Sequence, residues 1–204
     1  MNELLIYDTI GADWFGGGIT AQSVIGQLER FKGKRVTVRI NSPGGVADEG
    51  IAIYNALKRH DGGVDTVVDS IAASAASIIA LAGESRTTSS GGRWMIHRAM
   101  GLSIGNANDM SKTAEVLTKY DESLVEIYKE YMADDIDIMQ LLTDETWYTA
   151  DEAIAAGLST GRSELANDAV PVAAAWFKHP PQALFSKPKA AFRPMVLTHL
   201  TSRA

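Results

Sequence analysis

Residues 35–59 are RVTVRINSPGGVADEGIAIYNALKR, and this stretch contains an expected strand, turn and helix in direct succession. Its first six residues, Arg35–Ile40, are dominated by Val, Ile and Thr, which favour extended backbone. From Val46 to Arg59 the sequence is amphipathic, as expected of a helix. A strand that leads through a glycine turn into a helix indicates an α/β fold.

The same alternation continues along residues 1–165 and predicts one α/β domain. A length of 204 residues and a hydrophobic fraction of 46% suit a single domain with a real core. The other expected strands are Leu4–Asp8, Thr66–Asp69 and Trp94–His97. The other expected helices are Thr20–Phe31, Ser74–Leu81 and a long one, Asn108–Met132.

The last part of the chain, residues 166–204, differs from the rest in composition. Five of the six prolines lie in it, and from Ala169 onward it has five basic residues and no acidic one. Proline lacks an amide donor and disrupts long helices and central strands. We therefore expect a basic tail, which is either a solvated terminus or an arm that docks on an acidic partner.

Composition excludes several classes of function. The net charge of −6 argues against a general nucleic-acid binder, which needs a basic face. The chain has no cysteine, so thiolate catalysis is excluded, and its four scattered histidines do not suggest a metal site. It has no apolar run long enough to cross a membrane and no secretory signal. We expect a soluble protein that is not exported and that acts on peptides or small molecules.

The turn INSPGG, residues 40–45, is the first segment that could carry chemistry. Gly44 and Gly45 permit backbone conformations closed to other residues and let a ligand approach the main chain. Free amides in such a turn would suit a developing oxyanion. Taken alone, the segment is more simply an ordinary turn.

The second such segment is SIAASAASIIALAG, residues 70–83, where a buried strand is expected to run into a helix. Ser74 stands at this junction, so its hydroxyl and the amide of Ala75 point to the same place near the positive end of the helix dipole. The alternative is that Ser74 only caps the helix. Ser70 and Ser77 are competing nucleophiles.

A serine nucleophile needs a histidine base within hydrogen-bond reach. Within the expected domain only His60 and His97 are available. His60 ends an amphipathic helix, where a solvated position is the simplest interpretation. His97 follows the apolar run RWMI, at a strand end where catalytic side chains of α/β proteins often emerge, although a single histidine there is more often structural.

Together, the segments INSPGG, AASAAS, WMIHRA and DETWYTADEAIAAGL resemble the Clp protease proteolytic-subunit (ClpP) family over roughly residues 4–160. The resemblance implies a cytoplasmic serine endopeptidase that needs no metal or organic cofactor. It also implies a ClpP/crotonase-like fold of ββα units and a long handle helix. The implied site has Ser74 as nucleophile, His97 as base, Gly45 and Ala75 as oxyanion-hole amides, and Gly44 and Gly101 beside the substrate.

The third triad residue departs from the family, in which it is usually an aspartate. In register with TADEAIAAGL the position falls on Glu145, with Asp144 adjacent as the alternative. A glutamate can orient a histidine through its longer side chain. Ser70 and Ala76 also replace the family's usual glycines near the nucleophile.

The first expected strand begins near residue 4, which leaves no room for the family's axial hairpin. Together with the segment ETWYTADEAIAAGL, residues 145–158, and the tail, this resembles the ClpP-like proteases of phages and prophages. That resemblance implies capsid and scaffold proteins as substrates, in the host cytoplasm or the assembling prohead. A housekeeping ATP-dependent subunit is the alternative, and a crotonase-type acyl-CoA enzyme and an inactive structural ring protein are further rivals.

The expected long helix bears on assembly. Tyr120 and Tyr128 are candidates for contact with a partner ring. We therefore expect a large, ring-like homo-oligomer. The remaining apolar residues of the helix recur at steps of three, four and seven, and this stripe is expected to pack on the domain: Met110, Ala114, Leu117, Leu124, Ile127 and Tyr131.

Overall fold

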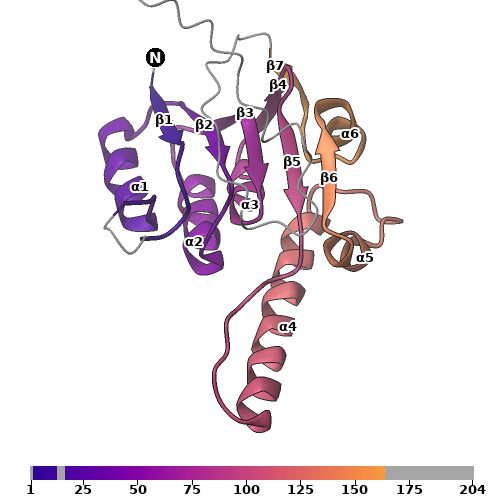
Figure 1. The fold of residues 1–204 in the computed structure, drawn as a ribbon. Helices are drawn as coiled ribbons and strands as arrows, with labels where there is room; N and C mark the ends of the chain where they lie inside the picture. The colour runs from indigo at the N-terminus through magenta and orange to yellow at the C-terminus, as the bar shows by residue number, and fades with distance from the viewer. Residues whose placement is uncertain (1, 13–16, 164–204) are drawn as a thin grey trace, which may run out of the picture.

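The computed structural model of the chain describes residues 2–12 and 17–163. Within these ranges strands and helices alternate, and helices pack against a sheet (Figure 1). The predicted α/β fold is therefore confirmed. The tail predicted for residues 166–204 lies outside the described residues.

Seven strands form one mixed sheet. Five of them run parallel in spatial order: β1 (Glu3–Ile6), β2 (Val36–Ser42), β3 (Val64–Ala73), β4 (Ser85–Ser89) and β7 (Gly161–Ser163). The other two, β5 (Arg93–Ile96) and β6 (Thr146–Thr149), are antiparallel to each other, and β5 also pairs with β3 in parallel.

The central strand β3 divides its pairing between two neighbours. Its first half pairs with β4, whereas its last three residues pair with β5. The C-terminal ends of β3 and β5 therefore lie side by side, with Ala73 opposite Met95. The chain leaves both strands at the same edge of the sheet.

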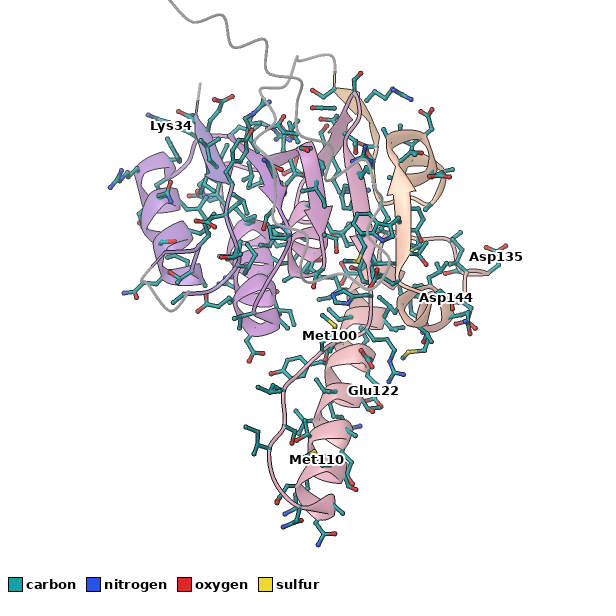
Figure 2. The ribbon with its side chains drawn as sticks, viewed as in Figure 1. Lys34, Met100, Met110, Glu122, Asp135 and Asp144 are labelled. Carbon is teal, nitrogen blue, oxygen red and sulfur yellow. The ribbon has the colours of Figure 1, made fainter. Side chains whose placement is uncertain are left out.

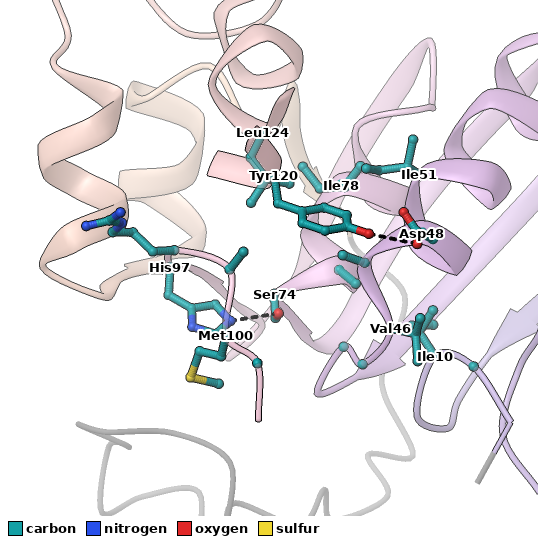
Figure 3. A pocket seen from close by; sticks show the side chains of 18 of the residues that line it. Ile10, Val46, Asp48, Ile51, Ser74, Ile78, His97, Met100, Tyr120 and Leu124 are labelled. Atoms are coloured by element: carbon teal, nitrogen blue, oxygen red, sulfur yellow. Dashed lines mark hydrogen bonds between the residues drawn. The ribbon is translucent and has the colours of Figure 1, made fainter. Parts of the chain in front are cut away.

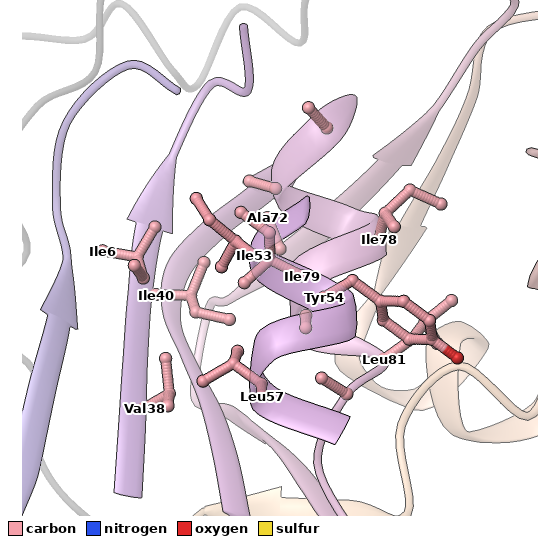
Figure 4. Close-up of a cluster of buried hydrophobic side chains, with 14 of the residues drawn as sticks. Ile6, Val38, Ile40, Ile53, Tyr54, Leu57, Ala72, Ile78, Ile79 and Leu81 are labelled. Atoms are coloured by element: carbon pink, nitrogen blue, oxygen red, sulfur yellow. The ribbon is translucent and has the colours of Figure 1, made fainter. Parts of the chain in front are cut away.

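Helices α2 (Ala47–Lys58) and α3 (Ala75–Ala80) cover one face of the central strands, and α1 (Ala21–Leu28) with the 3-10 turn η1 (Glu29–Phe31) lies beside α2. Alternate residues of β2 point to that face because side chains alternate along a strand. The buried side chains of Val38, Ile40, Ile53, Leu57 and Ile79 belong to the resulting core (Figure 4).

The long helix α4 (Ala107–Lys129) projects from the domain as the predicted handle does (Figure 1). Its buried residues are Asp121, Leu124 and Tyr128, all in its C-terminal half. Met110, 43% exposed, lies near the far end of the projecting part (Figure 2). Only the C-terminal half of α4 is therefore embedded in its own domain.

The prediction that Tyr128 contacts a partner ring is wrong. Its side chain is buried inside the subunit, and its hydroxyl lies 2.7 Å from Ser77 Oγ. The predicted apolar stripe also does not pack over its whole length, since Met110 is exposed. Helical periodicity indicates which residues share a face, but it does not show how much of the helix overlaps the domain.

Several elements were not predicted, namely β4, β6, β7, α5 (Ile138–Thr143) and α6 (Ala150–Ala155). The strand expected at Thr66–Asp69 is the middle of a 10-residue strand, and β1 ends at Ile6 rather than Asp8. Beyond Asp69 the strand continues through Ser70 and Ile71 to two alanines, and its last three residues pair with β5. None of the described helices is long and apolar enough to cross a membrane.

Candidate active site

Ser74 lies in an unusual backbone conformation where β3 turns into α3. Its φ of 54° makes it one of two non-glycine residues with positive φ among those that the structure describes. Its amide donates to the carbonyl of Met95 on the neighbouring strand at 2.9 Å. Its side chain makes no capping hydrogen bond to α3. The capping interpretation is therefore wrong, and the turn presents the hydroxyl instead.

The hydroxyl of Ser74 forms a hydrogen bond with the imidazole of His97, and the distance between Oγ and Nε2 is 2.7 Å (Figure 3). This distance is short enough for direct proton transfer between the two side chains. The contact follows from the topology, because Ser74 follows β3 and His97 follows β5 at the same edge of the sheet.

The competing candidates lie elsewhere. Ser77 is fully buried, and its hydroxyl is engaged with the Ser74 carbonyl and the Tyr128 hydroxyl. Ser70 lies within β3, before the turn. His60 Nε2 contacts the carbonyl of Lys34 at 2.8 Å, beyond the C-terminal end of α2. Among the candidate serines and histidines, which all lie in the described part of the chain, Ser74 and His97 are the pair in hydrogen-bond contact.

The two candidate acids differ in position. The antiparallel register of β5 and β6 pairs Ile96 with Thr146, so its continuation by one residue puts Glu145 opposite His97. Glu145 is 6% exposed and has a φ of 53°. Asp144 is exposed at the outer edge of the domain (Figure 2), and its carboxylate accepts a hydrogen bond from Gln140 at 2.9 Å. The geometry thus favours Glu145 as the acid.

The glycine turn lies directly against the nucleophile. Gly44 has a φ of 90°, and a Cβ there would lie 2.5 Å from the Ala73 carbonyl oxygen, 2.7 Å from Ser74 Cβ and 2.9 Å from the Ala75 nitrogen. Any larger residue would therefore clash with the Ala73 carbonyl and Ser74 Cβ and would crowd the Ala75 amide. This is why the position requires glycine.

Ile10 holds this turn in place. Its amide donates to the Gly44 carbonyl at 2.8 Å, and its carbonyl accepts from the Val46 amide at 2.9 Å. In such a parallel bridge the N–H of the intervening Gly45 points away from Ile10. Ala75 is the first residue of α3, where helix amides have no partner within the helix. Both predicted oxyanion-hole amides are thus in positions that free them from the scaffold.

A cavity of about 790 Å³ opens at the Ser74–His97 pair (Figure 3). Gly44 and Gly101, the two predicted substrate-binding residues, both line it. Its wall is mainly apolar, with side chains from α2, α3 and α4: Ile51, Ile78, Leu117 and Leu124. Such a cavity suits an apolar side chain of a bound ligand.

One polar contact spans this wall and was not predicted from the sequence. The Tyr120 hydroxyl of α4 donates to the Asp48 carboxylate of α2 at 2.8 Å (Figure 3). This hydrogen bond raises the pKa of the Tyr120 hydroxyl. The two residues are 72 positions apart, and no local sequence pattern connects them. The side chain of Tyr120, which was predicted to contact a partner ring, therefore makes a hydrogen bond within its own subunit.

No group of three histidine, aspartate or glutamate side chains in the part of the chain that the structure describes is arranged to hold a metal ion.

A serine and a histidine in hydrogen-bond contact, beside amides in a glycine turn, form an arrangement typical of serine hydrolases. A family model described as Clp protease matches residues 18–160. The chain belongs to the Clp protease family.

The chain is also similar to individual proteins named as Clp protease subunits. The chain is 35% identical over 131 residues to the ATP-dependent Clp protease proteolytic subunit 1 of Protochlamydia amoebophila. That match covers 62% of this chain and 64% of the relative. It is 34% identical over 124 residues to the ATP-dependent Clp protease proteolytic subunit of Bacteroides thetaiotaomicron, covering 59% of this chain and 56% of the relative. The chain thus spans less than two thirds of the length of either relative.

Among solved structures, a mutant of ClpP1 from Listeria monocytogenes has a TM-score of 0.66 to this chain at 24% identity. The match covers 82% of this chain and 92% of the other. The predicted ClpP-like fold is therefore confirmed.

The Gly44 contact yields a first test. Gly44→Ala should lower the rate at which a fluorophosphonate modifies Ser74 by about a hundredfold or more, because the new methyl group obstructs an oxyanion-hole amide. Gly91→Ala is the matched control, since Gly91 also has positive φ, 78°, but a Cβ there has no neighbour within 4 Å. Both variants carry backbone strain, and only the first blocks the site. Equal labelling rates for the two variants would contradict the assignment.

Proposed function

We propose that this chain is a serine endopeptidase that hydrolyses peptide bonds through Ser74, His97 and Glu145. The observation that carries the proposal is the 2.7 Å contact between Ser74 Oγ and His97 Nε2 at the mouth of the apolar cavity. Membership of the Clp protease family supports the same activity.

In the proposed mechanism the Ser74 hydroxyl attacks the peptide carbonyl carbon while His97 accepts the hydroxyl proton. The amides of Gly45 and Ala75 stabilise the oxyanion of the tetrahedral intermediate. His97 then donates the proton to the leaving amine, and the acyl-enzyme forms. A water molecule, deprotonated by His97, releases the acid product and restores Ser74. Glu145 orients the imidazole and stabilises its positive charge.

The proposed substrate is an extended peptide. It would lie between the turn at Pro43–Gly45 and the segment Gly101–Gly105, with Gly44 and Gly101 leaving room for its backbone. Hydrogen bonds to the peptide main chain would tolerate many sequences. The apolar cavity beside Ser74 would take one large apolar side chain.

The triad assignment predicts a specific ranking of variants. Ser74→Ala and His97→Ala should each lower peptide hydrolysis by about a thousandfold or more, since members of a triad act as one unit. Glu145→Gln should cost far more activity than Asp144→Asn, because Asp144 is exposed and pairs with Gln140. Steady-state kinetics on a fluorogenic peptide measures all four. The opposite ranking of the two acid variants would move the role to Asp144.

We also propose a ring-like homo-oligomer assembled through the projecting part of α4 and the loop before it. Leu102 and Ile104 in that loop are 91% and 89% exposed, and Val116 on α4 is 54% exposed. Apolar side chains gathered on one projection are typical of a protein interface. The curated relatives, which are named as proteolytic subunits, support the proposal.

Light scattering at micromolar concentration should therefore give a mass several times the 21.9 kDa of one chain. Ile104→Ser should shift the protein toward smaller species, because it removes apolar surface from the interface. Ile25→Ser, at a 42% exposed residue of α1, should leave the mass unchanged. A wild-type monomer would argue against the assembly.

The narrower proposal is that the substrates are phage capsid and scaffold proteins, cleaved in the host cytoplasm or the prohead. Its support is the resemblance to phage ClpP-like proteases, which includes residues 145–158, whereas the names of the curated relatives favour an ATP-dependent Clp protease subunit. The capsid-processing protease and the ATP-dependent subunit would differ in the products that they release. A capsid-processing protease should cut a purified phage scaffold protein into a few stable fragments without ATP. Degradation of a folded protein to short peptides only with ATP and a Clp-type unfoldase would favour the alternative.

A further inference from the structure

Asp121 is a fully buried carboxylate that the mechanism above does not use. It lies on α4, with an exposure of 0%. Its Oδ1 accepts a hydrogen bond from the backbone amide of Ala99, and its Oδ2 accepts one from Nε of Arg98, both at 2.7 Å. Burying a carboxylate is costly unless such donors compensate for the lost water. The side chain is thus held in one place by two charge-assisted bonds.

These two partners directly follow His97 in the chain. The segment from His97 to Met100 has no regular secondary structure, so no strand ladder fixes its backbone. The Arg98 amide donates to the carbonyl of Leu142 at 3.0 Å. Two further hydrogen bonds, from the Arg98 side chain and the Ala99 amide to Asp121, also hold this segment. These bonds thus hold the backbone directly after the residue that carries the His97 ring.

Asp121 is itself rigidly supported. Leu124 and Tyr128, three and seven residues further along α4, are buried in the core of the domain. Residues at these spacings share one face of a helix, so the face that carries Asp121 is the face that packs. Arg98, in contrast, has a half-exposed side chain, 48%.

We propose that Asp121 is a positioning residue that holds the His97 segment in the geometry needed for proton transfer from Ser74. The inference rests on the proposed function. The bond to the Ala99 amide is the main anchor, because it fixes the backbone itself two residues after His97. The ion pair with the half-exposed Arg98 contributes less, since solvent screens it.

The test measures the rate at which a fluorophosphonate modifies Ser74 in the full-length protein. Asp121→Ala should lower this rate by about a hundredfold, the scale of a general base that is no longer oriented. Arg98→Met should lower it much less. Glu122→Ala is the matched control, since Glu122 is the next acid on α4 and pairs only with exposed Lys119. It should leave the rate unchanged.

A double-mutant cycle separates positioning from a general structural effect. In a His97→Ala background, Asp121→Ala should cause no further loss of labelling, because a residue that acts through His97 has nothing left to position. A similar loss in both backgrounds, or a wild-type rate in folded Asp121→Ala, would overturn the inference. If wild-type protein is not labelled at Ser74 at all, the proposed function itself fails.

Asp121→Asn and Asp121→Ser cover the case in which the alanine variant does not fold. Both remove the charge, but only the asparagine oxygen can still reach the Ala99 amide. The asparagine variant should be labelled at least about tenfold faster than the serine variant, the difference expected for one buried hydrogen bond. Equal rates for the two would overturn the role of the amide anchor.

Discussion

The division of β3 between two partner strands is the constraint on which the site depends. The last three residues of β3 pair with β5 rather than β4, so the two strands that precede Ser74 and His97 end side by side. The bond from the Ser74 amide to the Met95 carbonyl continues this pairing into the turn. A register shift of one residue would turn the side chains of β5 to the opposite face and carry His97 away from Ser74. The 2.7 Å contact is therefore a property of the sheet as much as of the two side chains.

The backbone around the site is strained on two sides of His97. Ser74 and Glu145 are the non-glycine residues with positive φ among the described residues, and they lie on the strands that flank β5 or adjacent to them. Each such conformation costs about 1–3 kcal/mol and persists only where the surroundings over-determine it. Behind Ser74 that support comes from α3, all of whose residues are buried. Behind Glu145 it comes from the antiparallel pairing of β5 with β6. The site is thus preorganised by its scaffold before any ligand binds.

The sequence predicted the parts of the molecule that local patterns determine. The strand, glycine turn and helix of residues 35–59, and the placement of Ser74 and His97 at strand ends, follow from periodicity and small residues in short windows. What was missed depends on contacts between distant segments. The strand expected at Thr66–Asp69 was too short because the division of β3 between β4 and β5 is a contact between distant segments, and the role of Ile10 is made by its backbone alone, which leaves no trace in the residue type. Tyr128 was misassigned because the pattern of α4 does not show where the helix leaves the domain.

Two consecutive residues of helix α4 contact the two parts of the site, which are the region of the glycine turn and the segment after His97. Side chains of neighbouring residues on a helix point about 100° apart, so Tyr120 and Asp121 reach different walls. Tyr120 binds Asp48 in the first turn of α2, just after the glycine turn, whereas Asp121 binds the segment after His97. The apolar burial of Leu124 holds α4 on the domain and so maintains both polar contacts. The geometry of the oxyanion turn and that of the base are consequently linked by a helix as well as by the sheet, and the packing of the handle on its own domain is part of how the site is built.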